Sequence, residues 1–387
     1  MDEETRLIRA GRQPKKLAKT VGPPIQKGST VLLPNAKALY EDELGYGRAG
    51  LATQMTLADA LAELEGATAV QLYPSGLAAL TGAMLAVLKA GDEVLVADCV
   101  YKPTRRFCDT VLRRFGVLVR YYDPLLAPEA VLELATAATR LIVMESPGSL
   151  TFEVQDVPGI AALARQRGIL TLMDNTWGAG LLFKPLAHGV DISVQALTKY
   201  VGGHSDIFMG SAATSDSKIA RQLEDGMHEL GWSVAPEAAY DMLRGLRTLP
   251  TRLARHGASG IEVAQWLTRQ PEVLRVIHPA LPGDPGHALW SRDYSGACGL
   301  FGFVLRPGSQ KAVNAFLDTL KLFGLGFSWG GFESLAIHCD PQLGRRTVKR
   351  DFGGPLIRLH IGLESPADLI ADLRSGLDAY AAATASS

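Results

Sequence analysis

The stretch LIVMESPGSLTFEVQDVPGIAALARQRGILTLMD, residues 141–174, decides the fold class of this 387-residue chain. It opens with an apolar run of strand length, passes through a turn segment with proline and glycine, and continues as a helical pattern before a second apolar run begins. Two strands joined by a helix in this way lie parallel in one sheet, and the helix covers a face of that sheet. The stretch therefore predicts an α/β fold.

The same alternation continues on both sides of that stretch. Apolar runs of strand length occur at residues 93–98, 117–123 and 192–197, and helical patterns occur at residues 105–116 and 128–140. Together they predict a large domain in which a mostly parallel sheet is flanked by helices.

The character of the sequence changes near residue 245. A long helical segment, RLARHGASGIEVAQWL, is followed by the strand-like runs VLRVIHP, GLFGFVL and LIRLHIG, which predict a smaller C-terminal α+β domain. At the other end the chain is polar and irregular, with PKK, GPP and LPN interrupting any periodicity. We therefore expect an arm over residues 1–55 that packs on a neighbouring subunit, a large domain over 56–245 and a C-terminal domain over 246–387.

Composition argues against several kinds of partner. Lys and Arg together number 39 and Asp and Glu 40, so the net charge of −1 gives no electrostatic footprint for nucleic acid or an acidic membrane surface. The N-terminal sequence MDEETRLIRAGRQPKK has charges where a signal peptide needs an apolar core. We expect a cytoplasmic protein without a metal site, whose cysteines are free thiols because no CxxC pair occurs: Cys99, Cys108, Cys298 and Cys339.

An uncharged run at residues 66–88, GATAVQLYPSGLAALTGAMLAVL, approaches the length of a membrane span. The Pro74-Ser75-Gly76 turn at its centre favours a strand, a tight turn and a buried helix instead. At that turn the amides of Gly76 and Leu77 could point at an anion, with the helix dipole behind them. An ordinary helix N-cap at Ser75 explains the turn equally well.

Two charged residues follow apolar strands. Asp174 must be paired or hydrogen-bonded there, because burying an unpaired charge is very costly, so it either caps the next turn or faces a cationic ring nitrogen. Lys199 is either a surface lysine or, in a low dielectric, an amine nucleophile with a lowered pKa. An anion cradle at Ser75-Gly76, then Asp174 and Lys199, would lie at one sheet edge. The three features match the phosphate, the pyridine nitrogen and the aldehyde of pyridoxal 5'-phosphate.

The segment DNTW…SVQALTKYVGGHSD, residues 174–206, resembles the active-site region of the pyridoxal-phosphate (PLP) enzymes of cysteine and methionine metabolism. The resemblance covers nearly the whole chain after the arm, and it implies a fold type I PLP-dependent transferase-like architecture with that cofactor. Further motifs carry it: GYGRAG (45–50), YPSG (73–76), VYKPTRRF (100–107), ESPGSLTFEVQDVP (145–158), RGLRTL (244–249), FSWGGFESL (327–335) and LIRLHIGLE (356–364).

Two features favour the family members that act at the β-carbon of their substrate. Gly148-Ser149-Leu150 stands where the γ-acting members usually have Thr-Asn-Pro, and Ala196 stands where they usually have Ser. The resemblance therefore implies a carbon–sulfur lyase that splits L-cystathionine by β-elimination into homocysteine, pyruvate and ammonia, as in methionine biosynthesis.

Three alternatives stay open. The first is a γ-acting relative, that is cystathionine γ-lyase, cystathionine γ-synthase or methionine γ-lyase, which shares the same cofactor residues. The second is a β-lyase for other cysteine S-conjugates, because the distal part of the pocket is not legible in the sequence. The third is a regulatory protein that keeps the PLP-binding fold without turnover.

The resemblance also implies roles for the residues that would bind the cofactor. Lys199 would hold pyridoxal phosphate covalently and later remove the Cα proton of the substrate, while Asp174 would keep the pyridine nitrogen protonated. Tyr101 would stack on the ring. The phosphate would be bound by the amides of Gly76 and Leu77 and by the hydroxyl of Thr198, and by Tyr46 and Arg48 from a neighbouring subunit.

For the substrate, an amino acid, the resemblance implies that Arg358 clamps the α-carboxylate. Ser328, Trp329 and Tyr101 would line the substrate pocket, and Tyr46 is a candidate proton donor to the leaving thiolate. The family further implies a homo-oligomer, a tetramer built as a dimer of dimers. His204 and His360 lack a second ligand at metal spacing, so we expect them to be structural.

Overall fold

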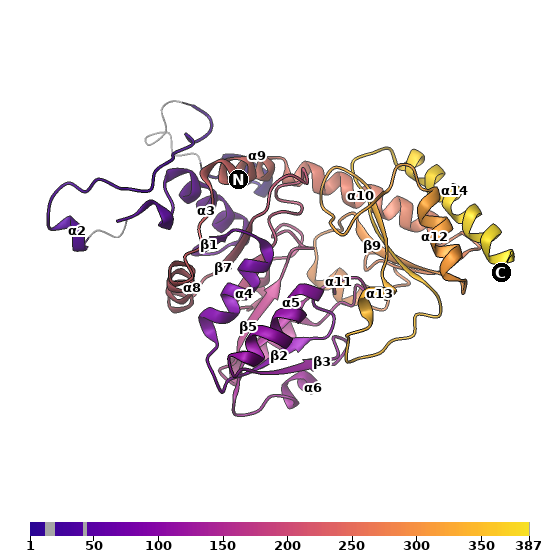
Figure 1. Cartoon of the computed structure of the whole chain (residues 1–387), viewed down its shortest axis with the longest axis horizontal. Helices are drawn as coiled ribbons and strands as arrows, with labels where there is room; N and C mark the ends of the chain where they lie inside the picture. Colours follow the sequence, from indigo (N-terminus) through magenta and orange to yellow (C-terminus); the bar gives the residue numbers. More distant parts are fainter. Residues whose placement is uncertain (12–19, 42–44, 387) are drawn as a thin grey trace.

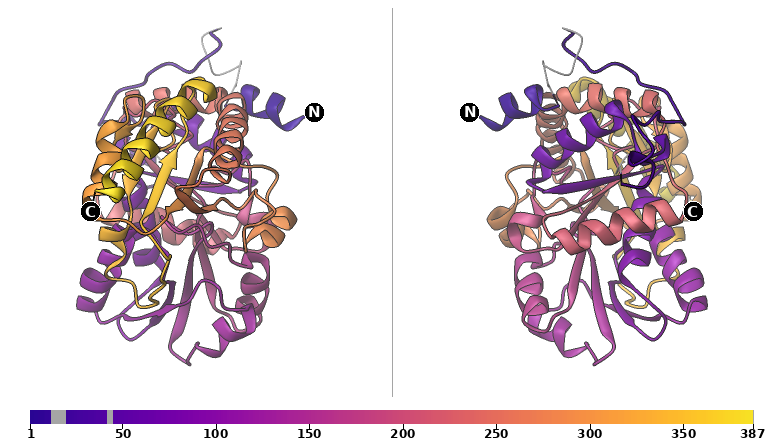
Figure 2. Two further views of the ribbon diagram at one scale, coloured as in Figure 1. Left: turned by 90° about the vertical axis from the view of Figure 1, so that its right-hand side faces the viewer. Right: turned by 90° about the vertical axis from the view of Figure 1, so that its left-hand side faces the viewer.

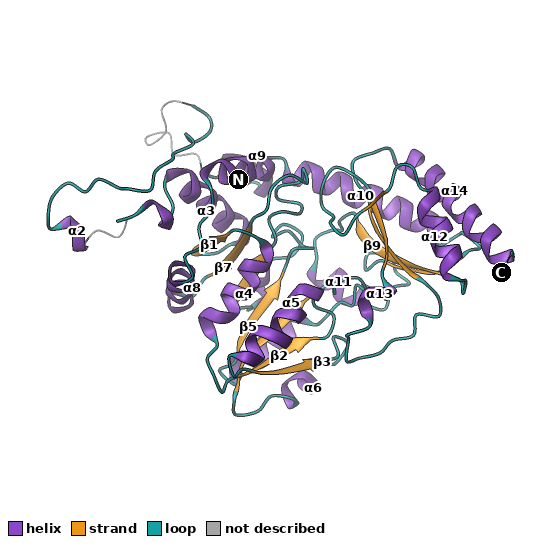
Figure 3. Ribbon diagram, viewed as in Figure 1, coloured by secondary structure: helices purple, strands orange, loops and turns teal. Residues whose placement is uncertain are grey.

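The computed structural model of the chain describes residues 1–11, 20–41 and 45–386, and it has two β-sheets with helices packed against both. The larger sheet has seven strands in the order β1-β7-β6-β5-β4-β2-β3. The α/β fold class predicted from the sequence is confirmed (Figures 1 and 3). The strands of this sheet are β1 (Ala69–Tyr73), β2 (Glu93–Ala97), β3 (Leu118–Tyr122), β4 (Thr139–Glu145), β5 (Leu170–Asp174), β6 (Ile192–Gln195) and β7 (Gly210–Thr214).

Five of these strands, β2 to β6, run parallel, and β7 pairs antiparallel with both β1 and β6. The central strands are almost wholly buried because helices cover both faces, which explains their near-continuous apolar sequences. Strand β7 was not predicted from the sequence. Its residues GSAAT are mostly small, and they lack the run of β-branched or aromatic side chains that is typical of a strand. The segment is a strand because it pairs with β1 and β6 on its two sides.

Helices lie on both sides of the large sheet, as the two side views show (Figure 2). The run at residues 66–88 is β1, the Ser75 turn and the buried helix α4, as predicted. The helices of this part are α3 (Ala52–Glu65), α4 (Gly76–Val87), α5 (Lys102–Phe107), which continues as a π-helical turn Cys108–Leu112, α6 (Pro128–Glu133), α7 (Val157–Gln166), a 3-10 turn Pro185–His188, α8 (Ser217–Glu229) and α9 (Pro236–Arg247).

The long helix α10 (Leu249–Leu267) leads into the C-terminal part. That part has a second sheet in the order β10-β11-β12-β9-β8. One face of this sheet packs on the C-terminal helices. Its strands are β8 (Val273–Ile277), β9 (Leu300–Leu305), β10 (Gly324–Leu325), β11 (Leu335–His338) and β12 (Leu356–His360), and its helices are α11 (His287–Asp293), α12 (Gln310–Thr319), α13 (Asp340–Leu343) and α14 (Pro366–Ala385).

The N-terminal arm has two different parts. Helix α1 (Glu3–Arg9) packs on its own chain, with Leu7 buried in the main core. From residue 20 the chain extends away from the body, with the short helix α2 (Ala38–Glu41) and the 3-10 turn Gly47–Ala49 (Figure 1). Leu32 and Tyr40 on this extension are each 92% exposed, which is unusual for large apolar side chains. Residues 12–19 and 42–44 of the predicted arm lie outside the described residues.

The four cysteines are buried and free, as predicted. Over residues 1–11, 20–41 and 45–386, no helix combines the length and the apolar character needed to cross a membrane. The same described residues contain no cluster of three or more histidine, cysteine or acidic side chains suited to a metal ion.

Candidate active site

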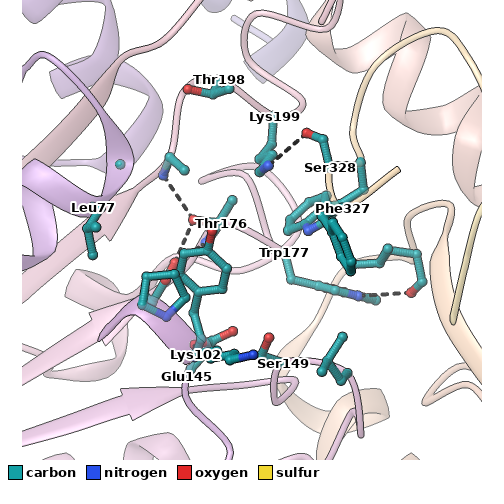
Figure 4. A pocket seen from close by; sticks show the side chains of 18 of the residues that line it. Leu77, Lys102, Glu145, Ser149, Thr176, Trp177, Thr198, Lys199, Phe327 and Ser328 are labelled. Carbon is teal, nitrogen blue, oxygen red and sulfur yellow. Dashed lines mark hydrogen bonds between the residues drawn. The ribbon is translucent and has the colours of Figure 1, made fainter. Parts of the chain in front are cut away.

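A pocket of about 660 Å³ opens where the carboxyl ends of the parallel strands face the second sheet. Glu145 ends β4, Asp174 ends β5, and Lys199 follows β6 by four residues. Arg358 reaches the same pocket from β12. The pocket therefore combines residues that the sequence separates by more than two hundred positions (Figure 4).

Lys199 points into this pocket with its ammonium in a mostly dry environment. Its Nζ donates a hydrogen bond to Ser328 Oγ at 2.9 Å and lies 5.5 Å from the centre of the Trp329 ring. Burial and, to a smaller extent, the positive charge of Arg358 together lower the pKa of Lys199 to about 8, against an opposing effect of Asp174. A lysine in this state supplies a neutral amine near neutral pH, as covalent attachment of an aldehyde requires.

Asp174 is a buried carboxylate, and among the described residues only one of its oxygens accepts hydrogen bonds. Its Oδ1 accepts hydrogen bonds from the Thr176 amide at 3.1 Å and the Thr176 hydroxyl at 2.5 Å. Burial raises the pKa of Asp174, and the Thr176 hydrogen bonds and Lys199 only partly counter this. A cationic ring nitrogen placed against the second oxygen would stabilise the ionised form, so the site fits the pyridine of pyridoxal phosphate.

The turn before α4 fits the phosphate. Ser75 caps the helix, since its hydroxyl accepts the amide of Ala78 at 3.1 Å. The amides of Gly76 and Leu77 precede the first intrahelical bond of this twelve-residue helix and border the pocket. The N-cap expected at Ser75 is confirmed, and because it serves Ala78 it leaves the first two amides available; their contact with a phosphate stays a prediction.

Gly76 is required by a close approach. A Cβ atom at this position would lie 2.3 Å from the Cβ of Ala196, far inside van der Waals contact. The missing side chain lets the start of α4 come against the turn that carries Lys199. Phosphate cradle and lysine are thus brought to the same end of the pocket.

Thr198 borders the pocket, but its hydroxyl has partners within the chain. Its Oγ1 donates to the carbonyl of Met209 at 3.2 Å and accepts the amide of Met209 at 3.0 Å. A phosphate contact from this hydroxyl would need a rotation that gives up the bond to the carbonyl.

Arg358 is a buried cation without a carboxylate partner among the described residues. Its side chain is 6% exposed, and only Nη2 has acceptors, the carbonyls of Ser328 at 2.9 Å and Gly326 at 3.4 Å. Burial lowers its pKa, with Cys339 and Tyr101 acting in the opposite direction. An arginine with a free edge toward a pocket is suited to a bidentate carboxylate.

Tyr101 is held from below by Glu145. The Glu145 carboxyl accepts the Tyr101 amide at 2.6 Å, and it lies beside Asp174, because the two residues are register partners on β4 and β5. Burial raises the pKa of Glu145 well above its usual range, and the neighbouring Asp174 adds to this. The Tyr101 side chain remains 44% exposed at the pocket, in a position to cover a flat ring.

The remaining predicted pocket residues lie on the segment between β10 and β11. Ser328 binds Lys199, as described, and Trp329 packs against Tyr200 with ring centres 5.5 Å apart. Phe327 is 76% exposed at the pocket mouth. His360 lies in the core below, where its Nε2 contacts the backbone of Gly330 and Gly331, in keeping with the structural role expected for it.

Tyr46 and Arg48 do not reach this pocket. They lie on the extended arm, where the Arg48 guanidinium stacks over the Tyr46 ring at 5.4 Å and Arg48 borders a different, smaller cavity. The contribution expected of them from a neighbouring subunit stays a prediction.

Glu145, Thr176 and Lys102 are among the pocket residues that received no role from the sequence. Glu145 and Thr176 carry signals that could have revealed them, since Glu145 ends a buried strand beside Asp174 and Thr176 follows Asp174 by two residues. Lys102 had no such signal, because an exposed lysine next to Tyr101 is indistinguishable from any surface lysine.

Comparison with known proteins identifies the family. Residues 4–378 match the family described as Cys/Met metabolism PLP-dependent enzyme. A putative cystathionine beta-lyase of Rhizobium johnstonii is 47% identical over 98% of this chain and 96% of its own length. Cystathionine beta-lyase MetC of Escherichia coli is 42% identical over 96% of this chain and 97% of its own length.

A solved structure gives the same result for the fold. The crystal structure of metB from Corynebacterium glutamicum matches with a TM-score of 0.91 and 29% sequence identity, covering 98% of each chain. The pocket fits the phosphate, the pyridine nitrogen and the aldehyde of the cofactor, and the family match spans nearly the whole chain. The protein therefore belongs to the Cys/Met metabolism PLP-dependent enzymes and uses pyridoxal phosphate.

Proposed function

We propose that the protein is a carbon–sulfur lyase that splits L-cystathionine by β-elimination into homocysteine, pyruvate and ammonia. The observation that carries the proposal is that one pocket holds two groups together. They are the amine of Lys199, whose pKa is lowered, and the guanidinium of Arg358, which has no carboxylate partner among the described residues. The likeness to cystathionine beta-lyases over nearly the full chain supports the choice of substrate.

Substrate orientation comes from Arg358. Its free edge binds the α-carboxylate, and the buried setting makes that charge pair stronger than it would be in water. Tyr101, supported by Glu145, would hold the cofactor ring by its face, and Asp174 would keep the ring nitrogen protonated. When bound, pyridoxal phosphate supplies the electron sink for the pair left at Cα.

Proton transfer is the work of Lys199. Once substrate has replaced it, the Lys199 amine takes the Cα proton, and Ser328 Oγ keeps that amine oriented at 2.9 Å. The bond between Cβ and sulfur then breaks, and its electron pair leaves with the sulfur as homocysteine thiolate. Released 2-aminoacrylate takes up water and gives pyruvate and ammonia, which balances the reaction.

The arm completes the site in this proposal. Its exposed apolar residues and its reach away from the body suit packing on a second copy of the chain, where Arg48 would bind the cofactor phosphate and Tyr46 would protonate the thiolate. Mixing the inactive variants Lys199→Ala and Arg48→Ala, with subunit exchange, should restore part of the activity. Failure to recover any activity in verified mixed oligomers would contradict the shared site.

Product analysis with L-cystathionine tests the reaction. Homocysteine and pyruvate in equal amounts are expected, and Lys199→Ala should lose both turnover and the covalent cofactor signal in the absorption spectrum. Lys218→Ala, which removes an exposed lysine of α8, serves as the matched control. Cysteine and 2-oxobutyrate as the products would instead establish the γ-acting alternative. The buried free thiols support our further proposal that the enzyme works in the reducing cytoplasm.

A further inference from the structure

Five charged side chains line the pocket: Lys102, Glu145, Asp174, Lys199 and Arg358. Four of them have an assignment in the chemistry described above, at the cofactor ring, the reacting carbon or the α-carboxylate. Lys102 is the remaining one. Among the described residues it has no hydrogen bond and no ion pair, so its ammonium is available to a ligand at the pocket.

The position of Lys102 is well defined by its neighbours. It is the first residue of α5 and directly follows Tyr101, whose amide is fixed by Glu145 at 2.6 Å. In the close view, Lys102 and Ser149 are drawn at the end of the pocket opposite Lys199 (Figure 4). A substrate held by Arg358 and Lys199 would therefore extend its distal end toward Lys102.

No described carboxylate forms an ion pair with this ammonium. The nearby Asp98 is already in a buried ion pair with Arg105, and Arg106 on the same helix does not border the pocket. Glu145 is bound to the Tyr101 amide. Among the described lining residues the only other carboxylate is Asp174, which faces Thr176 and the cofactor site. At the end of the pocket that holds Lys102, the nearest labelled carboxyl is therefore that of Glu145, whose pKa burial raises well above its usual range and which accepts the Tyr101 amide (Figure 4).

Part of the pocket lining is apolar. Leu150 and Phe152 are buried there, and Phe327 forms part of the mouth. A thioether stem can lie against these side chains without an unsatisfied polar group. The pocket lining thus combines a carboxylate clamp at Arg358, an amine at Lys199, apolar side chains and the unpaired ammonium of Lys102.

We propose that Lys102 binds the distal carboxylate of the substrate, so that the enzyme prefers cysteine thioethers whose sulfur substituent ends in an anion. This inference rests on the proposed function, because it names the substrate class of that same site. The distal ammonium of cystathionine is left to water. An S-substituent that ends in a carboxylate alone should consequently serve nearly as well as cystathionine, and one that ends in an ammonium should serve poorly.

The first experiment compares S-(2-carboxyethyl)-L-cysteine with S-(2-aminoethyl)-L-cysteine as substrates of the holoenzyme. We expect kcat/KM to favour the carboxylate by about tenfold, the lower end for a hydrogen bond to a charged group, because the Lys102 side chain is exposed. Lys102→Met should remove the preference and Lys102→Glu should reverse it. Arg106→Met removes the same charge one helical turn away and should keep the wild-type ratio.

The second experiment measures binding without any carbon–sulfur cleavage. L-2-aminosuberate and L-2-aminooctanoate differ only in a terminal carboxylate, and their dissociation constants follow from the spectral change of the holoenzyme cofactor. The dicarboxylate should bind about tenfold more tightly to the wild type and to Arg106→Met, and equally tightly as aminooctanoate to Lys102→Met.

The two experiments separate the two proposals. A binding preference that depends on Lys102 upholds this inference even if neither thioether is cleaved, in which case the lyase reaction is the part that fails. Equal affinities for the two ligands in the wild type, or a preference that survives in Lys102→Met, overturn the role of Lys102 while leaving the lyase reaction intact.

Discussion

Two buried arginines, Arg252 and Arg358, have nearly the same exposure and opposite surroundings. Arg252 is 7% exposed and Arg358 is 6% exposed. Arg252 donates to the Tyr200 carbonyl at 2.7 Å, the Gly245 carbonyl at 2.8 Å, the Thr248 hydroxyl at 3.0 Å and the Val201 carbonyl at 3.2 Å. Arg358 uses a single nitrogen, toward the carbonyls of Ser328 and Gly326.

The difference separates a structural arginine from a binding arginine. All three nitrogens of Arg252 have acceptors within the chain, and they tie the turn after Lys199 to the start of α10. Arg358 leaves its other nitrogens toward the pocket. Burial alone therefore does not identify a ligand site, whereas burial with unfilled hydrogen-bonding capacity does.

The strongest test of this comparison is Arg358→Met. We expect kcat/KM for cystathionine to fall about a thousandfold, equivalent to about 4 kcal/mol, because the substrate carboxylate would be buried without its cation. The thermal midpoint should stay the same or rise, since an apolar side chain replaces an unpaired buried charge. Steady-state kinetics and thermal denaturation of the same preparation check both points. A large loss of stability would mean that Arg358 is structural too.

The converse substitution is Arg252→Met. Its main expected effect is a loss of about 3 kcal/mol in the free energy of unfolding, because several buried carbonyls would lose their donor. Chemical denaturation of the apoprotein measures it. Arg255→Met, which removes an exposed arginine from the same helix, should change stability by less than about 0.5 kcal/mol. Equal effects of these two substitutions would refute the structural role of Arg252.

The pH dependence of cofactor capture probes the smallest of the three effects. With a Lys199 pKa of about 8, the neutral amine makes up about a tenth of the apoprotein at pH 7, so the rate of covalent attachment should rise as pH increases to 8 and beyond. Arg358→Met removes a like charge and should raise the pKa of Lys199, which slows attachment at pH 7. Stopped-flow absorbance at a series of pH values follows the reaction. An unchanged profile in Arg358→Met would show that the two cations are not coupled.

Strand-end reasoning was enough to place Asp174 and Lys199 at one sheet edge, because parallel strands bring their carboxyl ends together. The same reasoning applied to Glu145, but its partner is the amide of Tyr101, and backbone partners leave no pattern in a sequence. The N-cap at Ser75 was also legible in advance, since a serine before an apolar helix has few other uses.

Other features depended on contacts that no local pattern encodes. The segment at β7 became a strand through its two neighbours, and the short strands β10 and β11 were missed for the same reason. Arg252 lies in a helical pattern with Arg255 and His256, and only the fold shows that it is the arginine that is buried and binds the turn. The roles of Arg358, Tyr46 and Arg48 came from family resemblance rather than from physical pattern, and their tests lie ahead.

Helix α10 takes part in both hydrophobic cores. Its first turns contribute Leu249 and Leu253 to the core of the large sheet, and its last turns contribute Val263, Ala264 and Leu267 to the core of the second. A continuous helix of nineteen residues is a stiff rod, so it holds the turn that carries Lys199 and the sheet that carries Arg358 at a fixed separation. The distance between the Lys199 amine and the Arg358 guanidinium is therefore set when the protein folds. An amino-acid substrate binds across a separation that is already fixed before it arrives.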